Sequence, residues 1–437
     1  MRATVKYGLT MATVLLAMVI MIPYSSADDL VTTDDSGNIA WVLICSALVF
    51  IMTPGVALFY GGMLRRQSMT SVLAQTGLIM GIMATSWILV GYSLAFSGDL
   101  SGIVGNLDEF LLNGVSYDAI AEGSTIPDME FMVFQMMFAL ITAGIVLGAC
   151  IERIRFNAIA IFMALWSVLV YAPMAHWVWG GGFFDQTFTV LDFAGGTVVH
   201  ICAATTGLAL AAFVGRRSER TMKRAHSMPM VFIGFTLLWF GWLGFNGGSG
   251  LAADGVAVNA FVVTVIAPAA AMLSWALAQY IHVGRVNSLG LMSGALAGLV
   301  TITPAAGYVG PGYALLMGLV GGVICYFGVI FMRNKSGIDD ALDVFGVHGI
   351  GAIWGAIATG IFAMPEFVSE GYEGLIYGST DLFLGQLAAV AITLVFCFVM
   401  SYAIIWVVSK FMRVRLDEDE EIIGADIVEH GEPSYNM

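Results

Sequence analysis

Charged side chains are scarce in this sequence. Asp, Glu, Lys and Arg make up only 11% of its 437 residues, whereas hydrophobic residues make up 59% and the mean hydropathy is +0.88. Because an ordinary soluble domain carries about 25% charged residues, the composition excludes a soluble globular protein. It predicts an all-α integral membrane protein with many spans.

Cysteine and histidine patterns typical of disulfide or metal sites are also absent. The five cysteines lie inside apolar runs, are odd in number and show no CxxC spacing, so they predict neither a disulfide framework nor a metal site. A zinc site normally needs three protein ligands, and no His or Cys cluster supplies them, which makes an intramembrane metalloenzyme a weak alternative. We expect no metal, no cofactor and no enzymatic activity.

Residues 1–27 combine the three parts of a secretory signal peptide. Arg2 and Lys6 form a basic start, an apolar stretch follows, and Pro23 precedes the small residues that end at Ala27. This pattern predicts cleavage after Ala27. The alternative is an uncleaved first span, which the length of the apolar stretch disfavours because a span needs about 20 residues.

Eleven apolar runs long enough to cross a membrane follow this segment. They cover approximately residues 39–62, 69–96, 129–151, 157–174, 192–214, 229–246, 256–282, 288–303, 312–332, 344–363 and 381–411. We therefore predict eleven transmembrane helices in a domain of residues 28–412, in a multi-pass protein of the cell membrane. An acidic tail at 413–437 completes the chain.

Basic residues after the signal peptide occupy only alternate loops and the tail, and the other loops contain no Lys or Arg. The positive-inside rule then predicts that the chain enters the first span from outside and that its C-terminus lies inside. The outer loops carry acids such as Asp108 and Glu366. These acids would attract cations to the outer face, although they are equally well explained as solvated loop residues.

Two segments five spans apart share a pattern. Asp192 and Asp343 each open a span and each precede a histidine within an apolar run, His200 and His348 respectively. Phe-x-Gly-Gly sequences likewise close the first and sixth spans. Because elements five spans apart run in opposite directions, the pattern predicts a five-plus-five inverted repeat with an extra eleventh helix and a substrate path at the midplane.

His200 and His348 are the strongest candidates for function. An ionisable group inside a membrane is costly and marks a functional site by default. A single such histidine is equally well explained by packing, but two at matching repeat positions favour a shared site. Two neutral imidazoles offer a donor and an acceptor along an apolar path, which suits a small uncharged molecule.

Aromatic residues near the outer ends of the spans form a second candidate site. They are Phe134, Phe138, Trp179, Trp242 and Phe245, followed by the hydroxyl of Ser249. Each aromatic ring alone is explained as packing or as an interfacial anchor. Gathered at one mouth, they would form a cation–π cage for a small monovalent cation. Asp192, in contrast, is typical of a helix N-cap.

These motifs resemble the Amt branch of the Amt/Mep/Rh ammonium transporter family, from about Asn38 to Tyr435. The resemblance rests on Thr53-Pro-Gly-Val-Ala-Leu-Phe-Tyr-Gly-Gly62, Glu152-Arg-Ile-Arg-Phe156, Ala175-His-Trp-Val-Trp-Gly-Gly-Gly182, Asp192-Phe-Ala-Gly-Gly-Thr-Val-Val-His200, Gly241-Trp-Leu-Gly-Phe-Asn-Gly-Gly-Ser249 and Asp343-Val-Phe-Gly-Val-His-Gly349. It implies a homotrimer with one pore in each subunit. Gly247 stands where some members have Ala or Pro.

The resemblance also implies roles for individual residues. Phe138, Trp179 and Ser249 would form the outer ammonium recruitment site, with Asp192 beneath the vestibule. The pore and its gate would comprise the stacked phenyl rings, the residues lining them and the twin histidines, namely Phe138, Phe245, Phe134, Trp242, His200 and His348. The implied function is ammonium uptake; the alternatives are an ammonium sensor and a passive ammonia gas channel of the Rh type, which Trp179 and Ser249 disfavour.

Electrostatics predicts how ammonium would cross. Moving a bare ion of this size into a low dielectric costs on the order of 20 kcal/mol in the idealised limit, whereas a cation–π contact returns only about 2 kcal/mol. We therefore expect NH4+ to be recruited outside and deprotonated below the phenyl gate. NH3 would then pass the histidines and be reprotonated inside.

The tail after Arg415 has the composition of a solvated acidic segment. It also resembles the cytoplasmic regulatory tail of the family, which contacts neighbouring subunits and takes part in regulation by a P-II-type nitrogen signalling protein. Membrane lipid, a homotrimer and such a regulator are therefore the expected partners, and nucleic acid is not.

Overall fold

In the part of the chain that the structure describes, eleven helices are long and apolar enough to cross a membrane, as the sequence predicts. The structure is a computed structural model that describes residues 35–120, 123–218 and 225–435. The predicted signal peptide lies outside the described residues. Long apolar stretches and internally satisfied backbone groups make these helices the stable form of the chain in a bilayer, and the protein is a multi-pass membrane protein.

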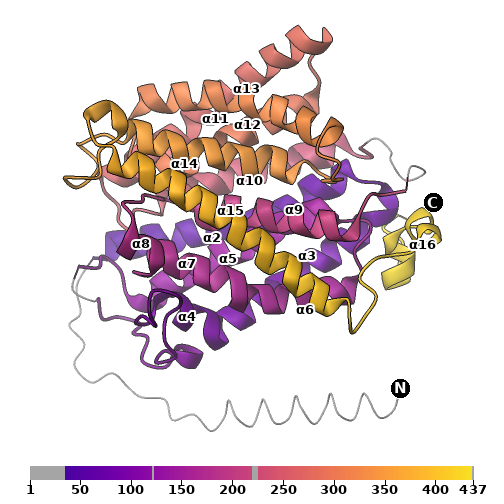
Figure 1. Cartoon of the computed structure of the whole chain (residues 1–437), viewed down its shortest axis with the longest axis horizontal. Helices are drawn as coiled ribbons and strands as arrows, with labels where there is room; N and C mark the ends of the chain where they lie inside the picture. Colours follow the sequence, from indigo (N-terminus) through magenta and orange to yellow (C-terminus); the bar gives the residue numbers. More distant parts are fainter. Residues whose placement is uncertain (1–34, 121–122, 219–224, 436–437) are drawn as a thin grey trace.

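The spans carry the labels of Figure 1. They are α2 (Ser36–Met63), α3 (Met69–Ser86) continuing into α4 (Tyr92–Phe96), α5 (Asp128–Cys150), α6 (Phe156–Trp166) continuing into α7 (Ala172–Trp179), α9 (Cys202–Val214), α10 (Met228–Gly247), α11 (Gly255–Val283), α12 (Ser288–Ile302), α13 (Pro311–Asn334), α14 (Ile350–Phe362) and α15 (Asp381–Val408).

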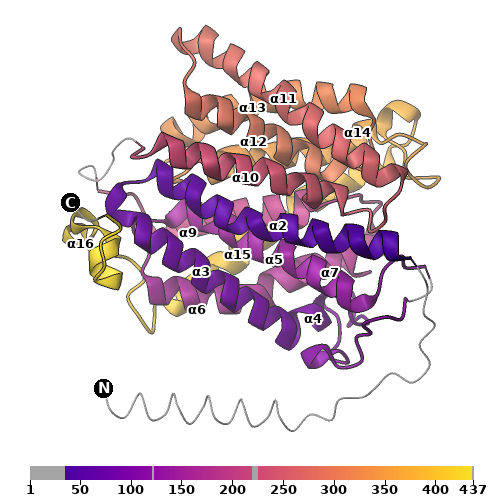
Figure 2. The ribbon, with the colours of Figure 1, turned by 180° about the vertical axis from the view of Figure 1, so that it is seen from behind.

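The helices form one bundle with two distinct ends. Figure 1 shows the short helix α8 (Phe183–Thr187) at one end of the bundle and α16 (Glu418–Ile423) at the other. Figure 2 shows the bundle from behind, with α16 again at one end. We call the end with α8 the vestibule end and the end with α16 the tail end. The helices from α2 to α9 make one half and those from α10 to α14 the other, while α15 runs obliquely across the bundle (Figure 1).

Helix packing follows the predicted inverted repeat. Helix α2 contacts α3 and α5 in one half as α10 contacts α11 and α12 in the other, and α5 packs on α9 as α12 packs on α14. Helices α2 and α10 join the halves at a very close crossing. A Cβ added to Gly234 would lie only 2.3 Å from the backbone nitrogen of Phe59, so this crossing requires glycine.

Both candidate histidines lie in single π-helical turns. His200 belongs to the turn Gly196–Ile201 before α9, and His348 to the turn Phe345–Gly349 before α14. Such turns are uncommon and occur frequently at functional sites. The two histidine-bearing turns also contact each other, which places them at the junction of the two halves.

Candidate functional site

A cavity of about 360 Å³ opens at the vestibule end. Its lining is mostly aromatic and apolar, and comprises Phe131, Phe134, Gln135, Phe138, Val178, Trp179, Asp192, Phe193, Ser249, Leu251 and Tyr308. All four residues predicted for the recruitment site are among them. A concave, largely aromatic site with a few polar groups is typical of a small-ligand site.

Trp179 and Ser249 are held in place by bonds to the backbone. The indole N–H of Trp179 donates to the carbonyl oxygen of Asp192 at 2.8 Å, and the hydroxyl of Ser249 donates to the carbonyl oxygen of Phe245 at 2.6 Å. Because Ser249 uses its proton in this bond, its lone pairs can accept a bond from a ligand. The site therefore presents a hydroxyl acceptor and aromatic rings, which together suit a small cation that can donate hydrogen bonds.

Two phenyl rings lie between this cavity and the histidines. The rings of Phe138 and Phe245 are stacked, with centroids 4.3 Å apart and planes 27° apart, and both side chains are buried. Phe138 also meets Trp179 edge to face at 6.0 Å. The predicted phenyl pair thus lies directly below the cavity and separates it from the interior.

Beyond the phenyl pair, the two histidines stack on each other. The ring centroids of His200 and His348 are 5.3 Å apart and their Nδ1 atoms are 3.3 Å apart. His200 also stacks on Trp242 at 5.2 Å and lies 6.0 Å from the ring of Phe245. The aromatic rings and imidazoles therefore form one continuous column from the vestibule end to the centre of the bundle.

The short Nδ1 to Nδ1 distance constrains the protons of the histidine pair. One Nδ1 must carry the proton of this bond and the other must accept it, so two neutral imidazoles are opposite tautomers. One remaining Nε2 is then a donor and the other an acceptor. The Nε2 of His200 is buried and has no hydrogen-bond partner among the described residues, which leaves it available to a passing molecule.

A very small space adjoins His348. Its volume is about 20 Å³, and Phe59, Tyr60, Trp242 and Leu296 are among the residues that line it. A volume of roughly 10–15 Å³ is sufficient for one water-sized molecule. The centre of the bundle can therefore hold a single molecule of the size of water or ammonia next to an imidazole.

Asp192 holds the start of the turn that carries His200. Its carboxylate accepts four backbone N–H bonds, from Gly195, Gly196, Thr197 and Val198, at 2.6–3.2 Å. This geometry confirms the predicted N-cap role. Burial raises the pKa of Asp192 above its ordinary value, while the four bonds act in the opposite direction. Asp192 thereby connects Trp179, bound to its backbone, with the histidine turn.

As the sequence predicts, Asp343 stands at the start of the tenth span, whose helical backbone begins at Val344. Asp343 does not repeat the capping role of Asp192, because its backbone is left-handed, with φ of 58°, and its carboxylate pairs with Arg333 on α13. The carboxylate of Asp340 instead accepts the N–H of Phe345, at 2.7 Å, where the π-helical turn begins. Asp340 precedes His348 by eight residues, which is also the spacing of Asp192 and His200.

Comparison with known proteins identifies the family. The sequence model of the Ammonium Transporter Family matches residues 40–435. An ammonium transporter of Bacillus subtilis is 46% identical over 399 residues, covering 91% of this chain and 98% of that protein. The chain belongs to the ammonium transporter family. Ammonium transporter Amt1 of Archaeoglobus fulgidus is 44% identical over 401 residues, covering 91% and 99% of the two chains.

Solved structures of this transporter family share the fold. The crystal structure of Saccharomyces cerevisiae Mep2 aligns with a TM-score of 0.81 at 32% identity, over 91% of this chain and 96% of that one. A structure described as a Sensor Amt Protein aligns with a TM-score of 0.83 at 28% identity, over 91% and 98%. Membership confirms the resemblance seen in the sequence, and ammonium transport is the activity for which the curated relatives are named.

Sequence reasoning missed two polar residues of the vestibule in this ammonium transporter family member. Gln135 lies between the predicted Phe134 and Phe138 in α5, so its position between two predicted site residues could have identified it. Tyr308 lies in the loop after α12 and its ring meets Phe193 edge to face at 5.4 Å. Nothing in the local sequence links Tyr308 to a cavity built largely by the other half.

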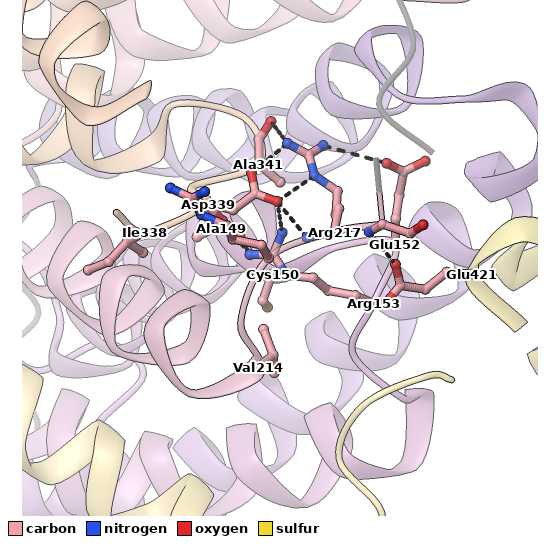
Figure 3. Close-up of polar contacts among 12 residues, drawn as sticks. Ala149, Cys150, Glu152, Arg153, Val214, Arg217, Ile338, Asp339, Ala341 and Glu421 are labelled. Carbon is pink, nitrogen blue, oxygen red and sulfur yellow. Dashed lines mark hydrogen bonds and ion pairs between the residues drawn. The ribbon is translucent and has the colours of Figure 1, made fainter. Parts of the chain in front are cut away.

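A network of ion pairs closes the tail end of the bundle. Figure 3 shows the guanidinium of Arg217 between Glu152 and Asp339, with Arg153 on the same Asp339. Arg153 is fully buried. Burial opposes ionisation of Asp339, but bonds and charge from Arg217 and Arg153 outweigh it and hold the pKa of this carboxyl at about 2. The motif around Glu152, seen in the sequence without a role, therefore ties three loops together.

The tail packs against this network. Arg155 pairs with Glu420 and Glu429, and the N–H of Ser71 donates to Asp426 at 2.8 Å. Glu421 and Asp426 are each only 1% exposed, so the solvated segment predicted from composition is wrong for these two acids. In the described residues, no three His, Cys, Asp or Glu side chains come together in a way that could hold a metal ion.

Proposed function

We propose that this protein takes up ammonium by binding NH4+ in the vestibule, removing its proton, and conducting NH3 past His200 and His348 to the tail end. The stacked His200 and His348, beyond a phenyl pair and an aromatic vestibule, carry this proposal. They lie in an apolar column whose smallest space fits one ammonia-sized molecule. Family membership supports the same substrate.

Electrostatics supports deprotonation before passage. The phenyl pair and the histidine turn are buried, and an unpaired, unhydrated cation in such surroundings costs many times what cation–π contacts return. Neutral NH3 avoids most of that cost and can exchange hydrogen bonds with the free Nε2 of His200. The proposal therefore has the cation lose its proton below the phenyl pair, before the histidines, and only ammonia continue.

Uptake by reconstituted protein tests this function directly. Proteoliposomes with the purified protein should take up ammonium faster than empty liposomes, and potassium no faster. Because a Sensor Amt Protein shares the fold, structure alone does not separate a transporter from a sensor. Specific binding of ammonium without any uptake would reject the transport proposal in favour of a sensor.

We also propose that the vestibule end faces outside and the tail end faces inside. The tail-end loops contain the basic residues, among them Arg153 and Arg217, as the positive-inside rule requires. A homotrimer with one pore in each subunit is proposed on family membership. Chemical crosslinking and native mass spectrometry of the detergent-solubilised protein test the trimer; a monomeric mass would reject it.

Trp179→Leu should weaken discrimination between ammonium and other monovalent cations. The substitution removes the indole ring that meets Phe138 edge to face in the vestibule. It retains an apolar side chain, so one cation–π contact is lost without a cavity in a buried core. We expect an approximately 10-fold weaker apparent affinity for ammonium, measured by uptake in competition with potassium. Trp177→Leu, an aromatic neighbour outside the cavity lining, is the control. If Trp179→Leu kept the wild-type selectivity for ammonium over potassium, Trp179 would be an interfacial anchor and not part of the binding site.

We propose that the tail takes part in binding a P-II-type regulator at the tail end. Arg65 donates to the backbone carbonyl oxygen of Glu421, and Arg155 pairs with Glu420 and Glu429. These contacts support a tail that holds the tail-end loops in one arrangement. A regulator that contacts the tail could thereby change the arrangement of the loops at the pore exit.

Truncation after Arg415 should leave a folded, membrane-inserted protein with impaired transport. The spans keep their mutual contacts, whereas Arg65 and Arg155 lose their tail partners. We expect several-fold slower uptake and loss of P-II binding in a pull-down. Asp417→Asn removes only an exposed pair with Arg413, which contributes little, and serves as the control. Equal P-II capture by the truncated protein would contradict the proposed contact.

A further inference from the structure

The loop before the second histidine turn contains a carboxyl group that the pathway described above does not use. Asp340 lies between α13 and the turn Phe345–Gly349 and is 7% exposed. Its Oδ2 accepts the N–H of Phe345, but its Oδ1 is buried and has no hydrogen-bond partner among the described residues. A buried, unpartnered carboxylate oxygen is costly unless it binds a proton or a ligand.

The two mirror-related aspartates differ in this respect. Asp192 uses both oxygens to accept four N–H bonds and has none free. Asp340 stands at the same distance from its histidine but keeps one oxygen free. The inverted repeat has therefore retained the cap in both halves while leaving a proton-binding atom only at the tail end.

The position of Asp340 connects the pore to open space. It lines a cavity of about 600 Å³ at the tail end, together with Arg65, Arg217 and Arg333. Through its bond with the N–H of Phe345, Asp340 is also joined to the turn that carries His348. Asp340 therefore stands between the histidine turn and the cavity at the tail end, where ammonia that leaves the pore would meet it.

We propose that Asp340 returns a proton to ammonia as it leaves the pore. This inference rests on the proposed function. The lone pair of NH3 takes the proton from the Asp340 carboxyl group, the O–H bond breaks and a fourth N–H bond forms, which gives NH4+ and a carboxylate. The carboxylate then takes a proton from water of the cavity, which is left as hydroxide.

The charged groups around Asp340 leave it able to bind a proton near neutrality. Burial raises its pKa to about 7, and the charge of Asp343 acts in the same direction. The N–H groups of Phe345 and Val344 and the charge of Arg153 oppose this rise. The other groups that interact with it are Tyr60 on α2, Cys150 at the end of α5 and Arg333 on α13.

Its two acidic neighbours in the loop are unsuited to this task. Asp339 is held as an anion by Arg217 and Arg153, with a pKa of about 2. Asp343 pairs with Arg333 through both carboxylate oxygens. An acid that is committed to an arginine cannot donate a proton at neutral pH, so Asp340 is the donor of this loop.

The experiment measures initial ammonium uptake into proteoliposomes whose tail end faces the lumen, at lumenal pH 6, 7 and 8 and constant external pH. The protonated carboxyl is the donor and predominates below about pH 7, so wild-type uptake should fall as lumenal pH rises past 7. Asp340→Asn keeps an oxygen for the N–H of Phe345 but has no proton to give. We expect uptake about 10-fold slower at pH 6 and independent of lumenal pH.

Three comparisons make the result specific. Asp340→Glu should restore most of the rate with a shifted midpoint. Asp343→Asn should keep a fall of uptake with pH, with its midpoint at a lower pH because the variant lacks a charge that raises the pKa of Asp340. The inference would be overturned if Asp340→Asn kept the rate and the pH dependence of the wild type. If the Asn variant fails to assemble, the Glu variant decides: an unshifted midpoint of uptake against lumenal pH would likewise overturn the inference. Absence of uptake by the wild type would instead reject the proposed function itself.

Discussion

Replacing Asp192 with Ala should abolish transport and destabilise the fold around the first histidine turn. The carboxylate satisfies four N–H groups at a buried helix start, and each buried donor left unpaired costs about 1–3 kcal/mol. The same loop anchors the indole of Trp179. Its relaxation would therefore disturb the vestibule and the position of His200 together.

Two measurements separate these effects. Ammonium uptake should fall at least 100-fold, and the temperature of unfolding in detergent should fall by several degrees. Asp192→Asn should also take up ammonium more slowly. Its amide NH2 group would face backbone N–H donors at the place where a carboxylate oxygen now accepts their hydrogen bonds. Asp185→Ala, at an exposed acid of the same end, is the control. Wild-type uptake by Asp192→Ala would show that the turn holds its shape without the cap.

The bundle could be predicted from sequence because its signals are local. Runs of about 20 apolar residues mark spans wherever they occur, and all eleven were found. The paired histidines were also predicted, since two ionisable residues at matching repeat positions are visible without coordinates. The stacked pair of Phe138 and Phe245 was predicted from the family resemblance. The stacking distances depend on how segments far apart in the sequence pack, which the sequence does not specify.

The sequence identifies Asp343 as the residue that opens the tenth span, but it does not identify Asp340 as the residue that caps it. Asp343 stands next to the tenth apolar run. Its left-handed backbone and its pair with Arg333 occupy Asp343, and the N–H of Phe345 at the start of the π-helical turn bonds to Asp340 instead. Hydropathy locates where a span begins only to within a turn, whereas a cap depends on the direction of individual N–H bonds.

The tail was misjudged because composition describes an average. Its many acids predict a solvated segment, yet Glu421 and Asp426 are buried and accept the backbone N–H groups of Ser218 and Ser71, which lie far away in the sequence. Tyr308 was missed for a similar reason, since it reaches the vestibule from the opposite half. Contacts between distant segments, unlike spans and caps, leave no periodic signal in one sequence.

The largest loss of transport is expected from substitution of the histidine pair. His200→Ala removes the ring that stacks between Trp242 and His348 and leaves the Nδ1 of His348 without its bond in a buried site. Ammonia then meets an apolar gap in place of an imidazole. We expect ammonium-dependent current to fall at least 100-fold, while the assembled protein remains, because the phenyl pair and the helix crossings are untouched.

His200→Glu should fail in a different way. A carboxylate in the column would stabilise an intact cation rather than a neutral molecule, so ammonium discrimination should be lost and potassium should carry current. The measurement is solid-supported-membrane current with ammonium and with potassium, for wild type, His200→Ala and His200→Glu. His282→Ala, at a histidine bonded to Tyr326 outside the pathway, is the matched control and should behave as wild type.

These two variants together decide whether the histidines conduct or only pack. If they only pack, Ala and Glu should lower stability without changing which ion is carried. If they form the path of ammonia, Ala should remove the ammonium current and Glu should add a potassium current, since the charge at this position determines the species that can cross. Full ammonium current in the Ala variant with no potassium current in the Glu variant would return both residues to structural packing.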